Sequence, residues 1–230
     1  MKKYLKNLTI IIVTFHSEYY LSNILRKLKN FKVIIVENSN NRYLKRKIEK
    51  KYKNVNFILS GSNIGFGSAI NIALVKNTSK FYLIVNPDCE FDVKTISKLY
   101  NIINKQKNIS VISPSTIDKK NRKTIRHGYF ISTFNKMKYI ENSILKEVDF
   151  VIGHFFLIRG NLFKKVGMFD ENIFLNYEEI DLFKRLKKKN YKIFIHKKSF
   201  VKHLDGYSGF LKQKKSNSLH EMMKNSKWHL

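Results

Sequence analysis

The first half of the chain alternates short, continuously apolar runs with amphipathic segments. The runs are Leu8–Phe15, Val33–Val36, Val55–Leu59, Phe81–Val85 and Ile109–Ser113. Continuous β-branched runs of this length are typical of strands that are buried on both faces. The segments between them predict helices near Leu21–Leu28, Arg42–Tyr52, Ser68–Lys76 and Val93–Asn104. Strands that alternate with helices predict an α/β fold, with a mostly parallel sheet covered on both faces.

The second half has a different pattern. Val148–Arg159 is long, apolar and aromatic and predicts one strand, and Tyr177–Lys189 predicts an amphipathic helix. Tyr191–Ile195 and Ser199–His203 predict two short strands. The 230 residues suffice for one domain. We assign it to residues 1–209, with halves at about 8–115 and 116–209, and treat 210–230 as a basic tail.

The charge of the chain is strongly positive but carries little functional information. Lys and Arg number 45 against 17 Asp and Glu, a formal net charge of +28. Such a charge favours an anionic partner, but the lysines are spread along the whole chain, as in a general compositional bias. The tail Lys212–Lys227 with Trp228 fits a basic helix on an anionic membrane. A frayed, lysine-rich terminus explains it equally well.

Cysteine content and apolar run lengths indicate a compartment. Cys89 is the single cysteine, so no disulfide forms within the chain. Leu8–Phe15 is far shorter than the roughly 20 residues that span a bilayer. We therefore expect a cytoplasmic protein, with peripheral contact to the inner face of the plasma membrane as a further expectation.

The tripeptide Asn86-Pro87-Asp88 directly follows the apolar run Phe81–Val85. Ligands of parallel sheets bind beyond the carboxyl ends of the strands, so a carboxylate there is well placed to hold a divalent cation. A type I turn with Pro at its second position explains the same tripeptide. The residues alone leave both interpretations open.

A glycine-containing segment, Gly61–Asn71, follows the third apolar run and opens a helix. Glycines allow the backbone to approach a ligand closely, and a helix N-terminus favours phosphate. The glycines at 61, 65 and 67 do not match the dinucleotide spacing G-x-G-x-x-G. A plain strand–turn–helix connection would also use glycine here.

Carboxylates are concentrated in one short stretch of this basic chain. The stretch contains Asp170, Glu171, Glu178, Glu179 and Asp181. Complementing the dipole at a helix N-terminus and pairing Asp181 with Arg185 would explain most of them. Neither use obviously requires the two adjacent glutamates, which we therefore treat as candidates for chemistry.

Taken together, these segments resemble the inverting glycosyltransferase family 2, and within it the bacterial rhamnosyltransferase-type enzymes of polysaccharide assembly. The matching stretches are IIVTFH (11–16), VEN (36–38), NIGFGSAIN (63–71), LIVNPD (83–88), VGMFDENIFLNYEEIDLFKR (166–185) and VKHLDGYS (201–208). They occur in the family's order and cover about residues 8–208. The resemblance implies a GT-A fold, the Rossmann-like fold of nucleotide-diphospho-sugar transferases.

The resemblance also implies a donor site and a metal site. The donor-binding residues would be Thr14, Phe15, Glu37, Asn63, Gly65, Phe66, Gly67, Asn86 and Asp88. Asn86 stands where the family often has the first acid of its D-x-D motif, which leaves Asp88 as the main carboxylate for Mn²⁺ or Mg²⁺. His203 would approach the same ion, although a lone histidine at a strand end is also a common hydrogen-bonding residue. His16, His127, His154 and His196 are expected in packing or at the surface.

Glu179 matches the family's catalytic base, with Glu in place of the usual Asp. Glu178, Asp181 and Arg185 would support the helix and the acceptor loop. The resemblance implies a single displacement at the anomeric carbon, with a nucleotide-diphosphate donor and a glycan or lipid-linked acceptor. dTDP-rhamnose is the first expectation for the donor, and a UDP-hexose is the alternative.

Two other functions fit the sequence less well. A nucleotidyltransferase would need a triphosphate loop after the first strand, which Thr14-Phe15-His16 does not supply. A basic RNA-binding module is the other alternative, but the chain lacks a recognisable RNA-binding signature. We therefore expect no nucleic-acid partner.

Overall fold

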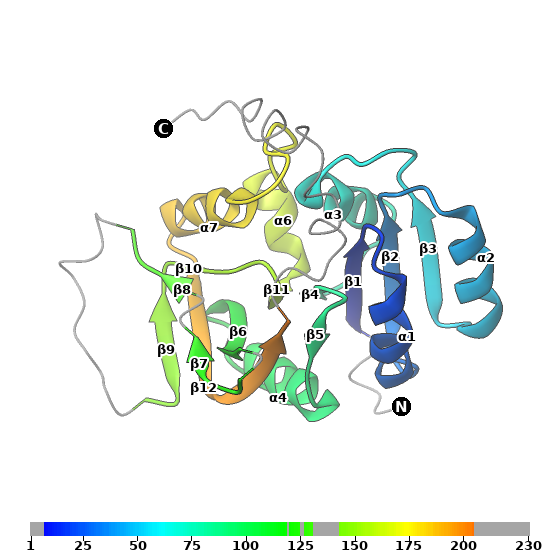
Figure 1. Ribbon diagram of the computed structural model, residues 1–230. Helices are drawn as coiled ribbons and strands as arrows, with labels where there is room; N and C mark the ends of the chain where they lie inside the picture. Colours follow the sequence, from blue (N-terminus) through cyan, green and yellow to red (C-terminus); the bar gives the residue numbers. More distant parts are fainter. Residues whose placement is uncertain (1–6, 119, 125–126, 131–142, 205–230) are drawn as a thin grey trace.

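The computed structural model describes residues 7–118, 120–124, 127–130 and 143–204, so the predicted tail at 210–230 lies outside the described residues. Four parallel strands form the first half of the main sheet (Figure 1). In spatial order they are β3 (Val55–Leu59), β2 (Lys32–Glu37), β1 (Leu8–Thr14) and β4 (Phe81–Val85). Ile11 of β1 lies between Ile34 of β2 and Ile84 of β4, which places the most apolar run at the centre. The predicted parallel sheet is confirmed.

The second half extends this sheet through one reversed strand. β11 (Phe155–Arg159) lies antiparallel between β4 and β6 (Ile109–Ile117). Beyond β6 lie β12 (Lys192–His203) and the short β5 (Cys89–Glu90). Six of the eight strands on this path share one direction, so the sheet is mixed and mostly parallel. The small strands β7 (Lys123–Thr124) and β9 (Leu145–Val148) pair with β6 and β12.

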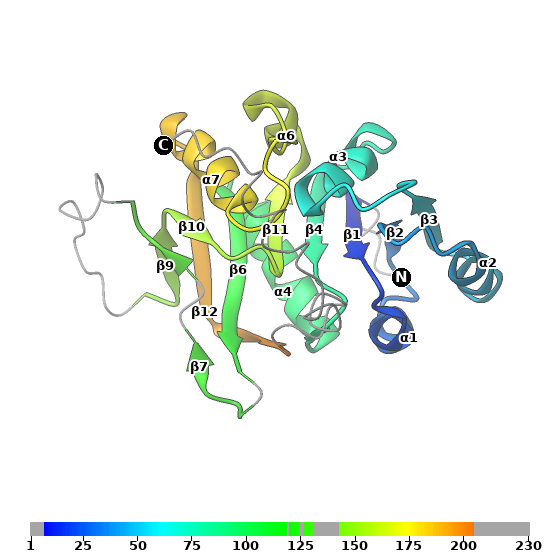
Figure 2. The ribbon, with the colours of Figure 1, turned by 45° about the horizontal axis from the view of Figure 1, so that its top comes forward.

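Helices cover both faces of the sheet and bury two separate clusters (Figures 1 and 2). One face packs against α1 (Glu18–Lys27), α2 (Arg42–Lys51) and α4 (Val93–Lys105). The other face packs against α3 (Phe66–Val75), α6 (Gly160–Val166) and α7 (Glu178–Lys188). Alternate residues of a strand point to opposite faces, so Ile10 and Ile12 join the first cluster and Ile11 joins the second. None of the helices in these ranges is long and apolar enough to cross a membrane.

Several predicted boundaries in the second half are wrong. Val148–Arg159 is not one strand, because β9 ends at Val148 and the chain then forms β10 (Phe150–Val151) before β11 begins. β10 pairs with β8 (His127–Gly128) in a separate two-stranded sheet. The carboxylate of the intervening Asp149 accepts a hydrogen bond from the Phe130 backbone at 2.9 Å, a contact that a hydrophobic pattern cannot reveal.

The last two predicted strands are instead continuous. Tyr191–Ile195 and Ser199–His203 merge into β12, whose register against β6 shifts between His196 and Phe200. The residues between the two predicted strands lie at this irregularity, and the strand continues through them. The bend carries the end of β12 to β5, where His203 pairs in register with Cys89.

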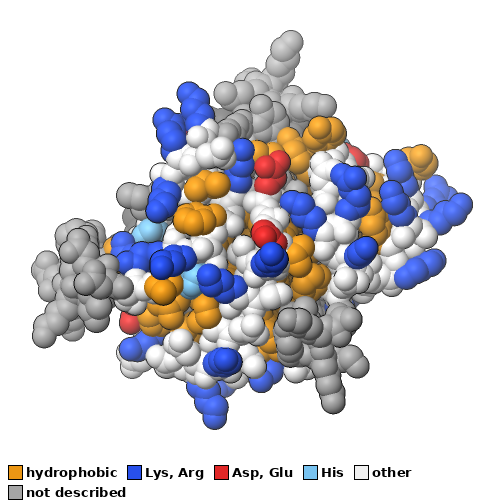
Figure 3. Space-filling view, turned by 90° about the horizontal axis from the view of Figure 1, so that it is seen from below, with side chains coloured by type: hydrophobic (Ala, Val, Ile, Leu, Met, Phe, Trp, Pro, Cys, Tyr) orange, Lys and Arg blue, Asp and Glu red, His pale blue; other side chains and the backbone are white. Residues whose placement is uncertain are grey.

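Basic side chains are scattered over the surface. Figure 3 shows Lys and Arg distributed across one whole face, with few Asp and Glu between them. The wide distribution agrees with the interpretation of the charge as a general compositional bias.

Candidate active site

The carboxyl ends of β1 and β2 bring two predicted donor residues together. Thr14 ends β1 and lies in register with Glu37, which ends β2. The backbone N–H of Asn38 donates to the Thr14 carbonyl at 2.8 Å, which continues the pairing by one residue. The Thr14 side chain is buried, and its hydroxyl has no hydrogen-bond partner among the described residues. Phe15 follows with its ring edge-on to His16 at 4.4 Å.

Glu37 orders the loop that follows β2. Its side chain is fully buried, and Oε1 accepts the Ser39 backbone N–H at 2.9 Å. Oε2 accepts the Asn41 backbone N–H at 2.7 Å. Both carboxylate oxygens thus accept hydrogen bonds within the loop, and the role of Glu37 in donor binding stays a prediction.

Asn38 links the end of β2 to the glycine segment. It is buried, and its Nδ2 donates to the Gly65 carbonyl at 3.0 Å and to Asn63 Oδ1 at 3.3 Å. Asn38 lies within the VEN stretch but was not among the predicted site residues. It holds two predicted donor residues against the strand edge.

The glycines of this segment permit a close approach to the loop before α7. Gly65 has φ +88°, and a Cβ there would lie 2.2 Å from the Phe174 carbonyl oxygen. The Phe66 N–H donates to the same carbonyl at 3.2 Å. A Cβ at Gly67 would meet the Phe169 side chain at 2.9 Å. The glycines therefore allow this segment to pack closely against the loop before α7. α3 begins at Phe66 rather than at the predicted Ser68.

Asp88 and His203 form a pair at the end of β4. Asp88 is 1% exposed, and its Oδ1 lies 3.3 Å from His203 Nε2. Neither carboxylate oxygen accepts a hydrogen bond from the residues that the structure describes. A buried carboxylate is costly unless it is paired, hydrogen-bonded or bound to a metal. The family resemblance assigned both residues to one metal site, and the fold brings their side chains into contact.

These two residues fit a divalent cation. Ligand atoms of Asp88, Cys89 and His203 all lie within 4.8 Å of one another. Carboxylate oxygens suit Mg²⁺ and Mn²⁺, whereas thiolates favour softer ions. The Cys89 thiol donates to the His154 carbonyl at 3.3 Å and belongs to the apolar core. Asp88 and His203 are therefore the suitable pair, and Cys89 supports the backbone beside them.

A cavity of about 690 Å³ opens beside Asp88. Its walls are the outer side of α1, the segment Pro87–Glu90 and Leu204. Cavities of this volume commonly hold small-molecule ligands. Asp88 thus combines burial with access to a space that a substrate could enter.

Glu179 lies at the start of α7 beside Gly153. Its side chain is 7% exposed, and its Oε1 accepts the Gly153 N–H at 3.2 Å. A Cβ added at Gly153 would lie 3.5 Å from the Phe66 ring and 3.6 Å from the Glu179 carboxyl carbon. The predicted base and the predicted donor residue Phe66 therefore flank the same glycine.

Burial raises the pKa values of both adjacent glutamates. Burial, together with the neighbouring Glu179 charge, raises the pKa of Glu178 to about 8. Burial also raises the pKa of Glu179, and its hydrogen bond from Gly153 partly opposes that rise. Raised carboxyl pKa values of this kind are common where carboxyl groups exchange protons near neutral pH.

Glu178→Gln should make the protein more stable at alkaline pH. The folded state holds the Glu178 proton up to a pKa of about 8, whereas the unfolded chain releases it near the usual value of about 4.3. Wild-type stability should therefore fall as pH rises between these values, and glutamine removes this loss. The expected gain is on the order of 1 kcal/mol or more at pH 8 and vanishes at pH 4. Urea unfolding at both pH values measures it, and equal gains at both would contradict it.

Asp181 and Arg185 form the predicted i,i+4 pair. Arg185 Nε donates to Asp181 Oδ2 at 2.9 Å, and Nη2 donates to the Met168 carbonyl at 2.7 Å. Arg185 also donates to the Val166 carbonyl at the end of α6. Asn71 of α3 holds the next residues, because its side chain both donates to and accepts from the Phe169 backbone. The loop before α7 is thus fixed at several points.

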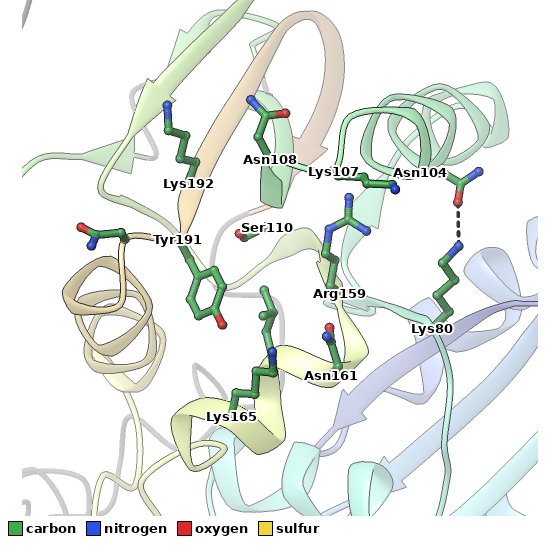
Figure 4. Close-up of a pocket in the computed structure, with 12 residues that line it drawn as sticks. Lys80, Asn104, Lys107, Asn108, Ser110, Arg159, Asn161, Lys165, Tyr191 and Lys192 are labelled. Atoms are coloured by element: carbon green, nitrogen blue, oxygen red, sulfur yellow. Dashed lines mark hydrogen bonds between the residues drawn. The ribbon is translucent and has the colours of Figure 1, made fainter.

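A second hollow, of about 520 Å³, lies at the opposite end of β4 (Figure 4). Its basic lining residues are Lys80, Lys107, Arg159, Lys165 and Lys192. Arg159 Nε donates to the Ile109 carbonyl at 2.7 Å, and Nη2 donates to the Gln106 carbonyl at 2.9 Å and to the Ile103 carbonyl. Arg159 therefore holds the end of α4 against β6, which is a structural use.

Arg159→Met should lower the free energy of unfolding by about 2–3 kcal/mol, because charge-assisted hydrogen bonds to three backbone carbonyls are lost. Lys165→Met is the matched control, since Lys165 lines the same hollow and is exposed. Chemical denaturation of both variants checks the expectation. Equal stabilities would show that the guanidinium does not hold α4.

His154 was expected only in packing or at the surface, yet it lies at the candidate site. Its ring stacks on His203 with centroids 4.7 Å apart and an interplanar angle of 24°. Its neighbour Gly153, which contacts Glu179, was likewise not among the predicted site residues. No spacing rule marks these residues, because they lie in the segment between β10 and β11, far along the chain from Asp88.

The sheet order, with helices on both faces, is that of the GT-A class of α/β folds. GalNAc-T7 in complex with UDP, GalNAc and Mn²⁺ matches with a TM-score of 0.70 at 16% identity, over 90% of this chain and 46% of that one. The mannosyltransferase PcManGT from Pyrobaculum calidifontis, with GDP-Man and Mn²⁺, matches with a TM-score of 0.67 at 11% identity, over 90% and 59%. These similarities establish the fold.

The chain belongs to glycosyl transferase family 2, whose model matches residues 9–167. The low-salt glycan biosynthesis hexosyltransferase Agl10 of Haloferax volcanii is 26% identical over 82% of this chain. The chain spans 64% of the length of that relative. The rhamnosyltransferase WbbL of Escherichia coli is 31% identical, over 77% of this chain and 75% of its own length.

Proposed function

We propose that the protein transfers a sugar from a nucleotide-diphosphate donor to a saccharide acceptor, with inversion at the anomeric carbon. The observation that supports this most is the placing of two groups on one short segment. His203, which pairs with Asp88, stacks on the His154 ring. The Asn86 N–H and the Cys89 thiol, on either side of Asp88 in sequence, donate to the His154 carbonyl, and Glu179 accepts from the Gly153 backbone. A cation-binding pair and a buried base are the groups that such a transfer needs.

Asp88 and His203 are proposed to hold the divalent cation. When bound, Mn²⁺ or Mg²⁺ would neutralise the charge that develops on the leaving diphosphate. Asn86, which precedes Asp88 by two residues, donates its backbone N–H to the His154 carbonyl at 2.9 Å. This bond fixes the loop that carries Asp88.

Glu179 is proposed as the base. It removes the proton of the acceptor hydroxyl as that oxygen forms a bond to the anomeric carbon. The bond from this carbon to the diphosphate oxygen breaks in the same displacement, and the electron pair leaves with the nucleoside diphosphate. The raised pKa of Glu179 makes its carboxylate a stronger base than an exposed glutamate. Glu178, Asp181 and Arg185 are proposed to support this helix and the acceptor loop.

The donor proposed first is dTDP-rhamnose, and a UDP-hexose is the alternative. The similarity to a rhamnosyltransferase at 31% identity supports dTDP-rhamnose. The similarity to a hexosyltransferase at 26% identity supports the alternative, a UDP-hexose. The predicted donor set from Thr14 to Asp88 lies along the carboxyl edge of the sheet. The acceptor is proposed to be a glycan or a lipid-linked saccharide, with peripheral membrane contact as a part of the same proposal.

A donor screen tests the function. Thermal shift with dTDP-rhamnose and UDP-hexoses, with and without Mn²⁺, should show stabilisation by one donor that requires the ion. Release of nucleoside diphosphate from that donor should then depend on an added acceptor and stop in EDTA. Undiminished release in EDTA would overturn the metal assignment. The absence of release from any of these donors, with acceptor and ion present, would overturn the proposed transfer.

A further inference from the structure

His154 is a buried histidine with defined neighbours on both its ring and its backbone. It lies immediately before β11 and is 2% exposed. One face of its ring stacks on His203 at 4.7 Å. Its Nε2 lies 2.9 Å from the hydroxyl oxygen of Thr116, a buried residue of β6. Two neighbours therefore limit the orientation of this ring.

The backbone of the same segment joins the two parts of the site. The His154 carbonyl accepts the Asn86 N–H at 2.9 Å and the Cys89 thiol at 3.3 Å, so its two donors flank Asp88 in sequence. The preceding Gly153 N–H donates to Glu179 at 3.2 Å. One dipeptide thus contacts both the cation-binding loop and the proposed base.

We infer that His154 is a positioning residue for the metal site, acting through His203. The stacked imidazole holds the His203 ring with its Nε2 toward Asp88, 3.3 Å from the carboxylate. Thr116 in turn fixes the His154 ring, so β6 supports β12 through two aromatic side chains. Groups that orient a metal ligand without touching the ion commonly change affinity by about 10–100-fold when they are removed. This inference rests on the proposed function, because it assumes that Asp88 and His203 hold a cation.

Mn²⁺ binding by the full chain tests the inference without any turnover. The loss of the free Mn²⁺ paramagnetic resonance signal on titration gives the affinity directly. His154→Ala should weaken binding by about 10–100-fold. His154→Phe restores a planar ring and should recover most of the affinity, and Thr116→Val should lose a smaller part of it.

His196→Ala is the matched control. His196 is likewise a buried histidine, at 3% exposure, but it lies on β12 away from Asp88. It should bind Mn²⁺ as the wild type does. Equal affinity of His154→Ala and wild type, or equal loss in His154→Ala and His196→Ala, would overturn the positioning role. If His154→Ala does not fold, Thr116→Val decides, and wild-type Mn²⁺ affinity in that variant would overturn the role.

The same titration separates this inference from the function. Weak or absent Mn²⁺ binding by the wild type would overturn the metal site and, with it, the role of His154. Tight Mn²⁺ binding by the wild type, without Mn²⁺-dependent turnover of any donor, would overturn only the proposed transfer.

Discussion

Glu179→Gln should lower the rate of sugar transfer by about 10²–10⁴-fold, the usual contribution of a positioned base. Glutamine keeps the shape of the side chain and an oxygen that can still accept the Gly153 N–H, the bond that holds Glu179 at 3.2 Å. It cannot accept a proton from the acceptor hydroxyl. Donor affinity and Mn²⁺ affinity should therefore stay near their wild-type values, and the loss should fall on kcat.

Glu178→Gln is the matched control for this experiment. The two glutamates are adjacent, and both are buried, at 4% and 7% exposure. We expect Glu178→Gln to retain transfer within about tenfold, since a group that only supports packing carries no proton in the reaction. Transfer by Glu179→Gln at the wild-type rate, or a larger loss in Glu178→Gln, would contradict the assignment of the base.

Asp88→Asn should abolish the dependence of transfer on Mn²⁺ and lower the rate by at least about 10²-fold, because metal assistance contributes several kcal/mol. Asparagine has nearly the same volume and is neutral, so the 1% exposed position should tolerate it. The substitution removes the carboxylate charge beside His203, so both Mn²⁺ affinity and donor affinity should fall. Metal titration and initial-rate measurements check these outcomes.

Glu90→Gln controls for charge removal near the same site. Glu90 lies two residues from Asp88 on β5, and its side chain is exposed. It should retain both the metal dependence and the rate. Metal-stimulated transfer by Asp88→Asn at the wild-type level would exclude Asp88 as the main ligand.

The sequence predicted the first half of the fold well, because a strand buried on both faces must be apolar throughout. Phe81–Val85 and Val55–Leu59 have the predicted bounds. In the second half the same rule failed at Val148–Arg159, where apolar residues serve three strands with different partners. The hydrophobic pattern indicates that a residue is buried, but it does not indicate which neighbouring element buries it.

The candidate site likewise contains residues that the sequence marks and residues that it does not. Asp88 and Glu179 could be proposed as site residues from the sequence, since one follows a strand end and the other stands in a rare cluster of carboxylates. Asn38, Gly153 and His154 could not, because their importance comes from contacts with residues far along the chain. His154, for example, contacts Thr116 and His203 across 38 and 49 residues, and nothing local marks those contacts.

The alternating α/β order and the family resemblance could be recognised in the amino-acid sequence alone, as could the residue types that can bind a cation or accept a proton. Those features follow from local burial and from residue chemistry at a few ordered motifs. Only the folded chain shows that Asp88 contacts His203 and that the Glu37 carboxylate accepts hydrogen bonds from its own loop. The same holds for Gly153-His154, which contacts both parts of the candidate site. These are distances between separate strands, and they are fixed by the order of the strands in the sheet and by the packing of loops at its carboxyl edge.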